Sequence, residues 1–214
     1  MASTDFSKLF EDGKVIRTEQ WEVTLRSRPL CDLLLPTGRV VACDPFTSPD
    51  AEPFAREVPP GSYPVTLSVA HFDDGDQRVA AAMVRFAGRE AVRWEMALAP
   101  EDDPAELGEG EIFGYGVDSG SGCFMDEAAA ESLLDRVESD ERYFDEMAAE
   151  MEKAYVDTWS WASLVPGETE PSNVVAFSSG VGDGRYASYF GLDEGGHVVS
   201  LVTDFSLFEP EEMS

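Results

Sequence analysis

The sequence predicts an α+β fold that is mainly antiparallel β, a sandwich or a partly open barrel, with one helical segment around residues 126–156. Three observations lead to this prediction. Apolar residues recur at every second position in several short segments, as in strands with one solvated face. The links between these segments are short, which favours antiparallel pairing. Apolar residues at helical spacing are concentrated between residues 127 and 156.

The first half of the chain is predicted to form strands. Residues 21–26 alternate between apolar and polar side chains, the period of a half-buried strand. Residues 33–35 and 40–43 flank a Pro-Thr-Gly-Arg sequence, which predicts a hairpin or a tight corner. A three-stranded meander is then expected over residues 63–69, 79–86 and 92–98.

The helical segment follows a predicted strand at residues 112–117 and a turn cluster at residues 118–122. Asp126 is the expected N-cap, because its carboxylate can accept a hydrogen bond from a backbone N–H of the first turn. Two apolar stripes suggest a break in the helix near residues 139–140.

The last part of the chain returns to strand. Residues 173–178 lead into a Gly-rich loop at residues 179–184. Two further strands, at residues 186–192 and 197–205, are joined by Asp-Glu-Gly-Gly, a strong hairpin signal.

Charge excludes several classes of partner. The 214 residues include 43 Asp and Glu against 15 Lys and Arg, for a formal net charge of -28. Phosphate backbones and anionic membrane surfaces repel such a chain, so neither nucleic acid nor a membrane is an expected partner. With 43% hydrophobic residues the chain nevertheless has enough apolar material for a packed core.

The organisation of the chain follows from composition. Residues 1–14 are expected to be a loosely ordered N-terminal segment, residues 15–208 a single domain, and residues 209–214 an acidic tail. The start has no secretory signal pattern, and no apolar run approaches the roughly 18–20 residues that span a bilayer. The three cysteines form no metal or disulfide pattern, so a cytoplasmic protein with reduced thiols is expected.

A local pattern occurs at three corners of the chain. It is a Ser or Thr followed by Gly, and seven residues after the Ser or Thr comes Asp44, Asp126 or, in the third copy, Tyr186. We expect these corners to gather at one end of a sheet. The residues predicted to form a binding site are Asp44, Asp118, Cys123, Asp126, Gly182, Asp183, Gly184 and Tyr186. The alternative is that the Asp side chains satisfy backbone groups in turns, as Asp commonly does.

Other chemistry is weaker in the sequence. Cys123 precedes a helix N-terminus and could act as a nucleophile with His71 or His197 as base, but apolar neighbours favour a buried, inert thiol. The loop at residues 179–184 lacks the lysine and the helix of a phosphate loop. The acidic turn at residues 73–76 does not have calcium-loop spacing. No catalytic residue, metal or cofactor is predicted.

Four segments resemble a known family. They are Leu35-Pro36-Thr37-Gly38-Arg39-Val40-Val41-Ala42-Cys43-Asp44-Pro45, Pro60-Gly61-Ser62-Tyr63-Pro64-Val65, Val117-Asp118-Ser119-Gly120-Ser121-Gly122-Cys123-Phe124-Met125-Asp126, and Ser178-Ser179-Gly180-Val181-Gly182-Asp183-Gly184-Arg185-Tyr186 with Thr203-Asp204-Phe205 further on. In this order they resemble the bacterial domain of unknown function 4241 family, over about residues 15–206. The resemblance implies no activity and no catalytic residues.

Two hypotheses of different classes follow. The first is a non-catalytic protein-binding module that steers onto a basic protein partner, by analogy with immunity-type inhibitors. The alternative is a small-molecule- or metal-binding enzyme or sensor, which requires Asp44, Asp126 and Asp183 to converge on one pocket.

Overall fold

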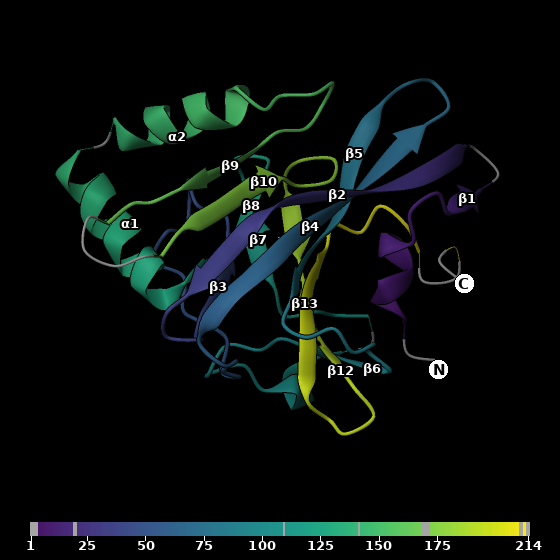
Figure 1. Ribbon diagram of the computed structural model, residues 1–214, viewed down its shortest axis with the longest axis horizontal. Helices are drawn as coiled ribbons and strands as arrows, with labels where there is room; N and C mark the ends of the chain where they lie inside the picture. The colour runs from purple at the N-terminus through teal and green to yellow at the C-terminus, as the bar shows by residue number, and fades with distance from the viewer. Residues whose placement is uncertain are drawn as a thin grey trace.

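Two antiparallel sheets, a two-stranded ribbon and a pair of helices form the main elements of the fold (Figure 1). The computed structural model describes residues 4–18, 21–108, 110–140, 142–167, 172–209 and 212. The predicted α+β class, mainly antiparallel β, is confirmed. Most of the predicted acidic tail lies outside the described residues.

The larger sheet has seven strands, and all of its pairings are antiparallel. In spatial order they are β1 (Val15–Arg17), β2 (Glu22–Leu35), β4 (Gly61–Phe72), β5 (Gln77–Arg85), β13 (Val198–Asp204), β12 (Ser188–Leu192) and β6 (Arg93–Met96). A 3-10 helix, η1 (Phe6–Phe10), packs on this sheet with Phe6 and Leu9 buried, within the segment expected to be loosely ordered.

The smaller sheet has four strands and is built from segments far apart in sequence. In spatial order they are β3 (Val40–Cys43), β8 (Ser121–Asp126), β10 (Val174–Ser178) and β9 (Trp161–Leu164). A two-stranded ribbon pairs β7 (Tyr115–Val117) with β11 (Gly184–Tyr186). Along the chain, β7 directly precedes β8 and β11 directly follows β10. A second 3-10 helix, η2 (Pro104–Glu106), interrupts the acidic loop after β6.

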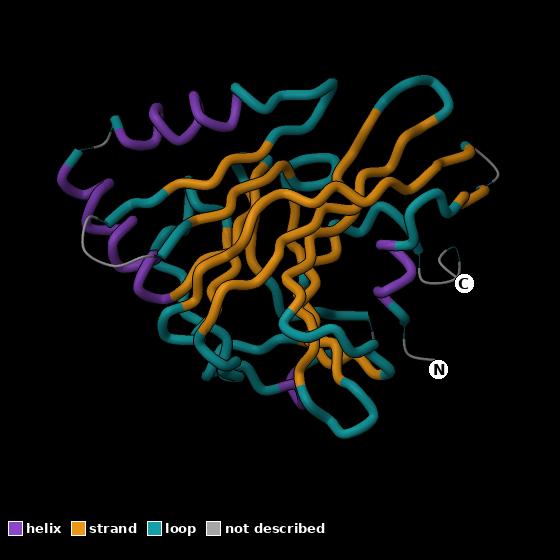
Figure 2. The backbone as a smooth tube through the Cα atoms, in the orientation of Figure 1, coloured by secondary structure: helices purple, strands orange, loops and turns teal. Residues whose placement is uncertain are grey.

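The helices α1 (Glu127–Ser139) and α2 (Tyr143–Glu152) cover the outer face of the smaller sheet (Figures 1 and 2). The break predicted near residues 139–140 separates them. Alternation decides which side chains face the helices. Along β8, Phe124 packs in the core between the sheets, while Cys123 and Met125 pack against the helices. No helix among the described residues is long and apolar enough to cross a membrane.

Several expectations change in detail, and the strands expected at residues 21–26 and 33–35 form one strand, β2. β6 does not pair with β5, because β13 pairs with β5 and places β12 between itself and β6. The strand expected from residue 112 begins only at Tyr115. Two short strands are not predicted by the sequence: β1, and β9 between the second helix and Pro166.

The Pro-Thr-Gly-Arg sequence forms a corner and not a hairpin, because β2 pairs with β4 and β3 pairs with β8. The corner therefore carries the chain from the larger sheet to the smaller one. Gly38 has a φ of +79°, and a Cβ at this position would overlap the carbonyl oxygen of Val58. Only glycine fits both conditions.

Candidate functional site

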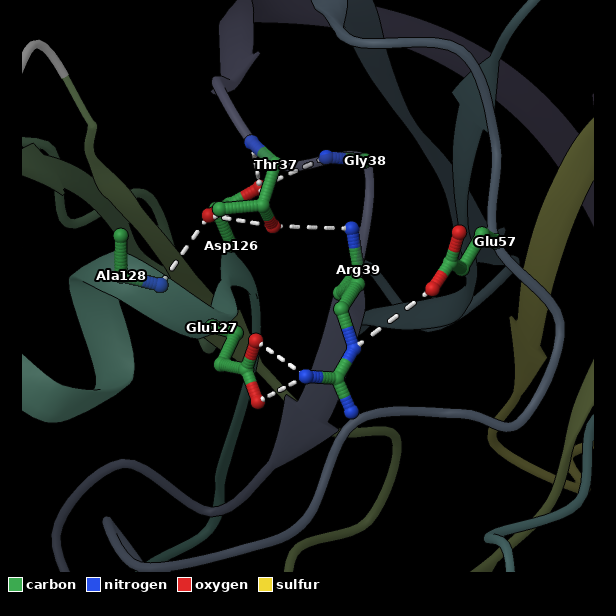
Figure 3. A network of polar contacts seen from close by, with 7 residues as sticks. All are labelled: Thr37, Gly38, Arg39, Glu57, Asp126, Glu127 and Ala128. Carbon is green, nitrogen blue, oxygen red and sulfur yellow. Dashed lines mark hydrogen bonds and ion pairs between the residues drawn. The ribbon is translucent and has the colours of Figure 1, made fainter.

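The carboxylate of Asp126 holds the corner between the two sheets (Figure 3). Asp126 is fully buried at the end of β8. The backbone N–H groups of Thr37 and Gly38 donate to its Oδ2 at 3.1 and 3.2 Å, and the Thr37 hydroxyl lies 2.9 Å from both oxygens. The N–H of Ala128 donates to Oδ1 at 3.0 Å, so the predicted N-cap of α1 is confirmed.

An ion pair flanks this corner at the surface. Arg39 Nη1 lies 2.6 Å from both carboxylate oxygens of Glu127, and Arg39 Nε lies 3.9 Å from Glu57 (Figure 3). The guanidinium is already engaged with two carboxylates of this chain, so it is not a free anion-binding group.

Asp44 forms the matching corner at the other end of β3. It is also fully buried. The N–H groups of Asp118 and Ser119 donate to Oδ2 at 3.0 and 2.8 Å, the Ser119 hydroxyl lies 2.7 Å from Oδ1, and the N–H of Phe46 donates to Oδ1 at 3.0 Å.

The two corners are reciprocal and distant from one another. In the β3–β8 pair Val40 is opposite Asp126, and Asp44 lies four residues further on, about 13 Å along the strand. Each carboxylate accepts hydrogen bonds from four donors, the capacity of its lone pairs. Neither has a lone pair left for a ligand, and Asp44 and Asp126 do not converge on one pocket.

The third corner lies beside the Asp44 corner and has no buried carboxylate. The N–H of Ser179 donates to the carbonyl of Gly120 at 3.0 Å, and the Tyr186 hydroxyl donates to the carbonyl of Gly182 at 2.9 Å. Asp183 and Gly184 are exposed. Burial, together with the nearby charge of Asp183, raises the pKa of Tyr186.

Cys123 is a buried thiol paired with another thiol. Cys123 and Cys43 lie opposite each other in the β3–β8 pair, both fully buried, with their Sγ atoms 3.6 Å apart. The Cys123 contact and burial raise the pKa of Cys43 well above its ordinary value. His197 instead contacts Asp193 at the tip of the β12–β13 hairpin, so it is not positioned as a base for Cys123.

A row of three serines crosses the end of the smaller sheet. Ser121 is opposite Ser178 in the β8–β10 pair, and the N–H of Ser178 donates to the carbonyl of Ser160, directly before β9. By alternation, the side chains of this row lie on the helix-facing side, where the preceding row contains Cys123 and Ala176. The helix-facing surface therefore changes from apolar to polar at this end.

An open groove of about 340 Å³ lies over the serine row. It is lined by Phe46, Ser119, Ser121, Ala148, Met151, Glu152 and Ser160. Ser121 is 7% exposed, and its hydroxyl, which is open to the groove, makes no hydrogen bond to the described residues. Glu152 has no ion-pair partner within that same part of the chain.

The model of one family, described as protein of unknown function (DUF4241), matches residues 33–203. The chain belongs to the DUF4241 family. This confirms the resemblance in the sequence. No match to the chain is found among the curated proteins or the solved structures.

The DUF4241 match contains every predicted site residue, which the structure divides between two places. Asp44, Asp118, Cys123 and the Gly182–Tyr186 segment lie at one end of the smaller sheet, and Asp126 lies at the other. The groove residues of α2 and Ser160 are not among the predicted site residues, since single Ser and Glu residues carry no recognisable pattern.

Proposed function

We propose that this DUF4241 protein is a non-catalytic binding module, of the immunity-inhibitor kind, that holds a basic protein partner against the helical layer. The observation that carries this proposal is the distribution of charge. Residues 127–157 contain eleven Asp and Glu against three Lys and Arg. An outer face of this composition attracts a cationic surface over several ångströms and raises the rate of encounter.

The packing of α1 leaves three of its acids exposed and available to a partner. Ala129, Leu133 and Val137 are buried against the smaller sheet, whereas Glu131, Asp135 and Glu138 are exposed. Those three acids recur at i, i+4 and i+7, and therefore form one stripe along the helix.

The enzyme or sensor alternative has less support. It requires three carboxylates in one pocket, but Asp44 and Asp126 accept full sets of internal hydrogen bonds at opposite ends of β3. Buried carboxylates with such partners contribute to folding rather than to ligand binding.

Capture from lysate of the native host, at about 50 and 300 mM salt, tests the proposal. We expect a basic protein to be captured at low salt and to be largely released at high salt. The variant E131Q/D135N/E138Q, which removes three charges from α1, should capture markedly less of the same protein.

The matched control is E90Q/E101Q/E106Q, because these three acids are also exposed but lie outside the helical layer. It removes the same net charge and should capture as much as the wild-type protein. If both variants capture equally less of the basic protein, the effect is due to net charge and not to the helical layer. If the wild-type protein captures no basic protein at either salt concentration, the proposal is contradicted.

A further inference from the structure

We infer that the groove over the serine row receives the side chain of one lysine or arginine of the basic partner. The inference rests on the proposed function and gives the acidic surface an anchoring pocket.

The floor of the groove supplies one hydroxyl, that of Ser121, which makes no hydrogen bond to the described residues. Ser160 and Ser178 bond one another, with the Ser160 N–H donating to Ser178 Oγ at 2.9 Å. Ser121 is different, because the residue is 93% buried and its hydroxyl makes no hydrogen bond to the described residues. The Ser121 Oγ atom is not fully enclosed, so it is open to the groove and can bond a donor or acceptor that enters it.

The walls suit the stem of a long cationic side chain. Phe46, from the segment after β3, and Met151, from α2, both line the groove. Lysine and arginine bury their methylene stems along apolar surface while the charged head reaches polar groups. The Phe46 ring can also attract a cation lying over its face.

The charge of the groove selects a cation over an anion. Glu152 is the carboxylate in the lining, and none of the lining residues is basic. The nearest base in sequence, Lys153, is engaged with Glu150. An ammonium or guanidinium group with access to Glu152 and to the serine hydroxyls would gain charge-assisted hydrogen bonds, whereas a phosphate would be repelled.

Backbone amide NMR can test the groove with small probes that need no identified partner. The probes are Nα-acetyl-arginine amide and Nα-acetyl-lysine amide, with the uncharged isostere Nα-acetyl-citrulline amide as reference. We expect saturable shifts, with a dissociation constant on the order of millimolar, confined to residues that line the groove. Citrulline should produce clearly smaller shifts.

Two substitutions locate the interaction. Glu152→Gln should weaken arginine binding by about fivefold, and Ser121→Ala by a smaller factor. Glu146→Gln, at an exposed acid on the same helix but outside the groove, should change it by less than about 1.5-fold.

Three results would overturn the inference: shifts scattered over the acidic surface without saturation, equal binding of citrulline, or equal effects of the Glu152 and Glu146 substitutions. None of these three results decides the proposed function, which the capture experiment tests separately. A basic protein could still be captured through the α1 stripe, and the Glu152→Gln variant would then capture it as well as the wild-type protein does.

Discussion

Asp44 and Asp126 hold the two ends of the β3–β8 strand pair in place. Each carboxylate lies at the end of one strand and binds the turn that leads into the other strand. Asp126, at the end of β8, binds the Thr37 turn that leads into β3, and Asp44, directly after β3, binds the Ser119 turn that leads into β8. The pair therefore fixes both ends of the β3–β8 ladder from within one sheet.

Replacing either carboxylate should destabilise the fold strongly. Asp126→Ala and Asp44→Ala each leave several buried donors without an acceptor, so we expect each to lower the free energy of unfolding by about 3 kcal/mol. Urea denaturation followed by circular dichroism measures this.

The control for the carboxylate substitutions is Asp118→Asn, whose exposed side chain takes no part in the Asp44 corner. It should change the free energy of unfolding by less than about 0.5 kcal/mol. Because the corners are well separated, the double variant should be additive within about 0.5 kcal/mol. A cost below about 1 kcal/mol for either alanine variant would refute the structural role of its corner.

Gly38 and Gly75 allow a matched test of the corner between the sheets. Both have positive φ, +79° and +95°, but a Cβ at Gly38 meets the carbonyl oxygen of Val58 while a Cβ at Gly75 meets open space. Gly75→Ala should cost about 1 kcal/mol from backbone strain alone. Gly38→Ala should cost about 3 kcal/mol or more, because the backbone must also move. Similar losses in the two variants would show that close packing at Gly38 is unimportant.

Asp204 makes stability depend on pH. Burial raises its pKa to about 6, with Glu209 adding to the rise and the Ser206 N–H opposing it. Between about pH 4 and 6 the folded protein retains a proton that the unfolded chain has released. The free energy of unfolding should therefore fall as pH rises through this window, by about 2–3 kcal/mol from this group.

The Asp204→Asn variant isolates this effect, because an amide oxygen can still accept from the Ser206 N–H, now 3.0 Å from the carboxylate. Thermal or urea unfolding at pH 4, 5, 6 and 7 measures the free energy of unfolding of both proteins. Relative to the wild-type protein, the variant should gain stability as pH rises, and it should be the more stable of the two at pH 7. Parallel curves for the two proteins would mean that Asp204 titrates normally.

The three thiols should differ in reactivity. Cys31 is partly exposed, whereas Cys43 and Cys123 are fully buried against one another. Burial raises the pKa of Cys31, so this thiol should react more slowly than free cysteine. Titration with a chromogenic disulfide reagent should count one thiol in the native protein and three in denaturant. Cys31→Ser should remove the native reaction, and rapid reaction of two or three native thiols would contradict the packing.

The features that the sequence predicts correctly are those that depend on residues close together along the chain. Asp126 was identified as an N-cap because the helical pattern begins at the next residue. The turn between β12 and β13 was predicted from its Asp and Gly residues for the same reason. Alternating side chains similarly revealed most strands, since each strand has one face in a core.

Pairings between distant segments could not be predicted in this way. The repeated corners suggested a relationship between Asp44 and Asp126, but not that each binds the other's turn, 75 to 89 residues away in sequence. The position of β6 was wrong because a short link suggests adjacent strands, whereas β13 and β12 arrive from the end of the chain. The serine row depends on the register of three strands, and scattered single serines do not specify it.

The most direct test of the proposed binding surface is hydrogen–deuterium exchange of the protein with and without the captured basic partner. The account predicts slower exchange in peptides from α1, α2 and residues 117–123, and unchanged exchange in the β4–β5 hairpin and η1. Protection that falls on the hairpin or η1 and leaves both helices unchanged would contradict it.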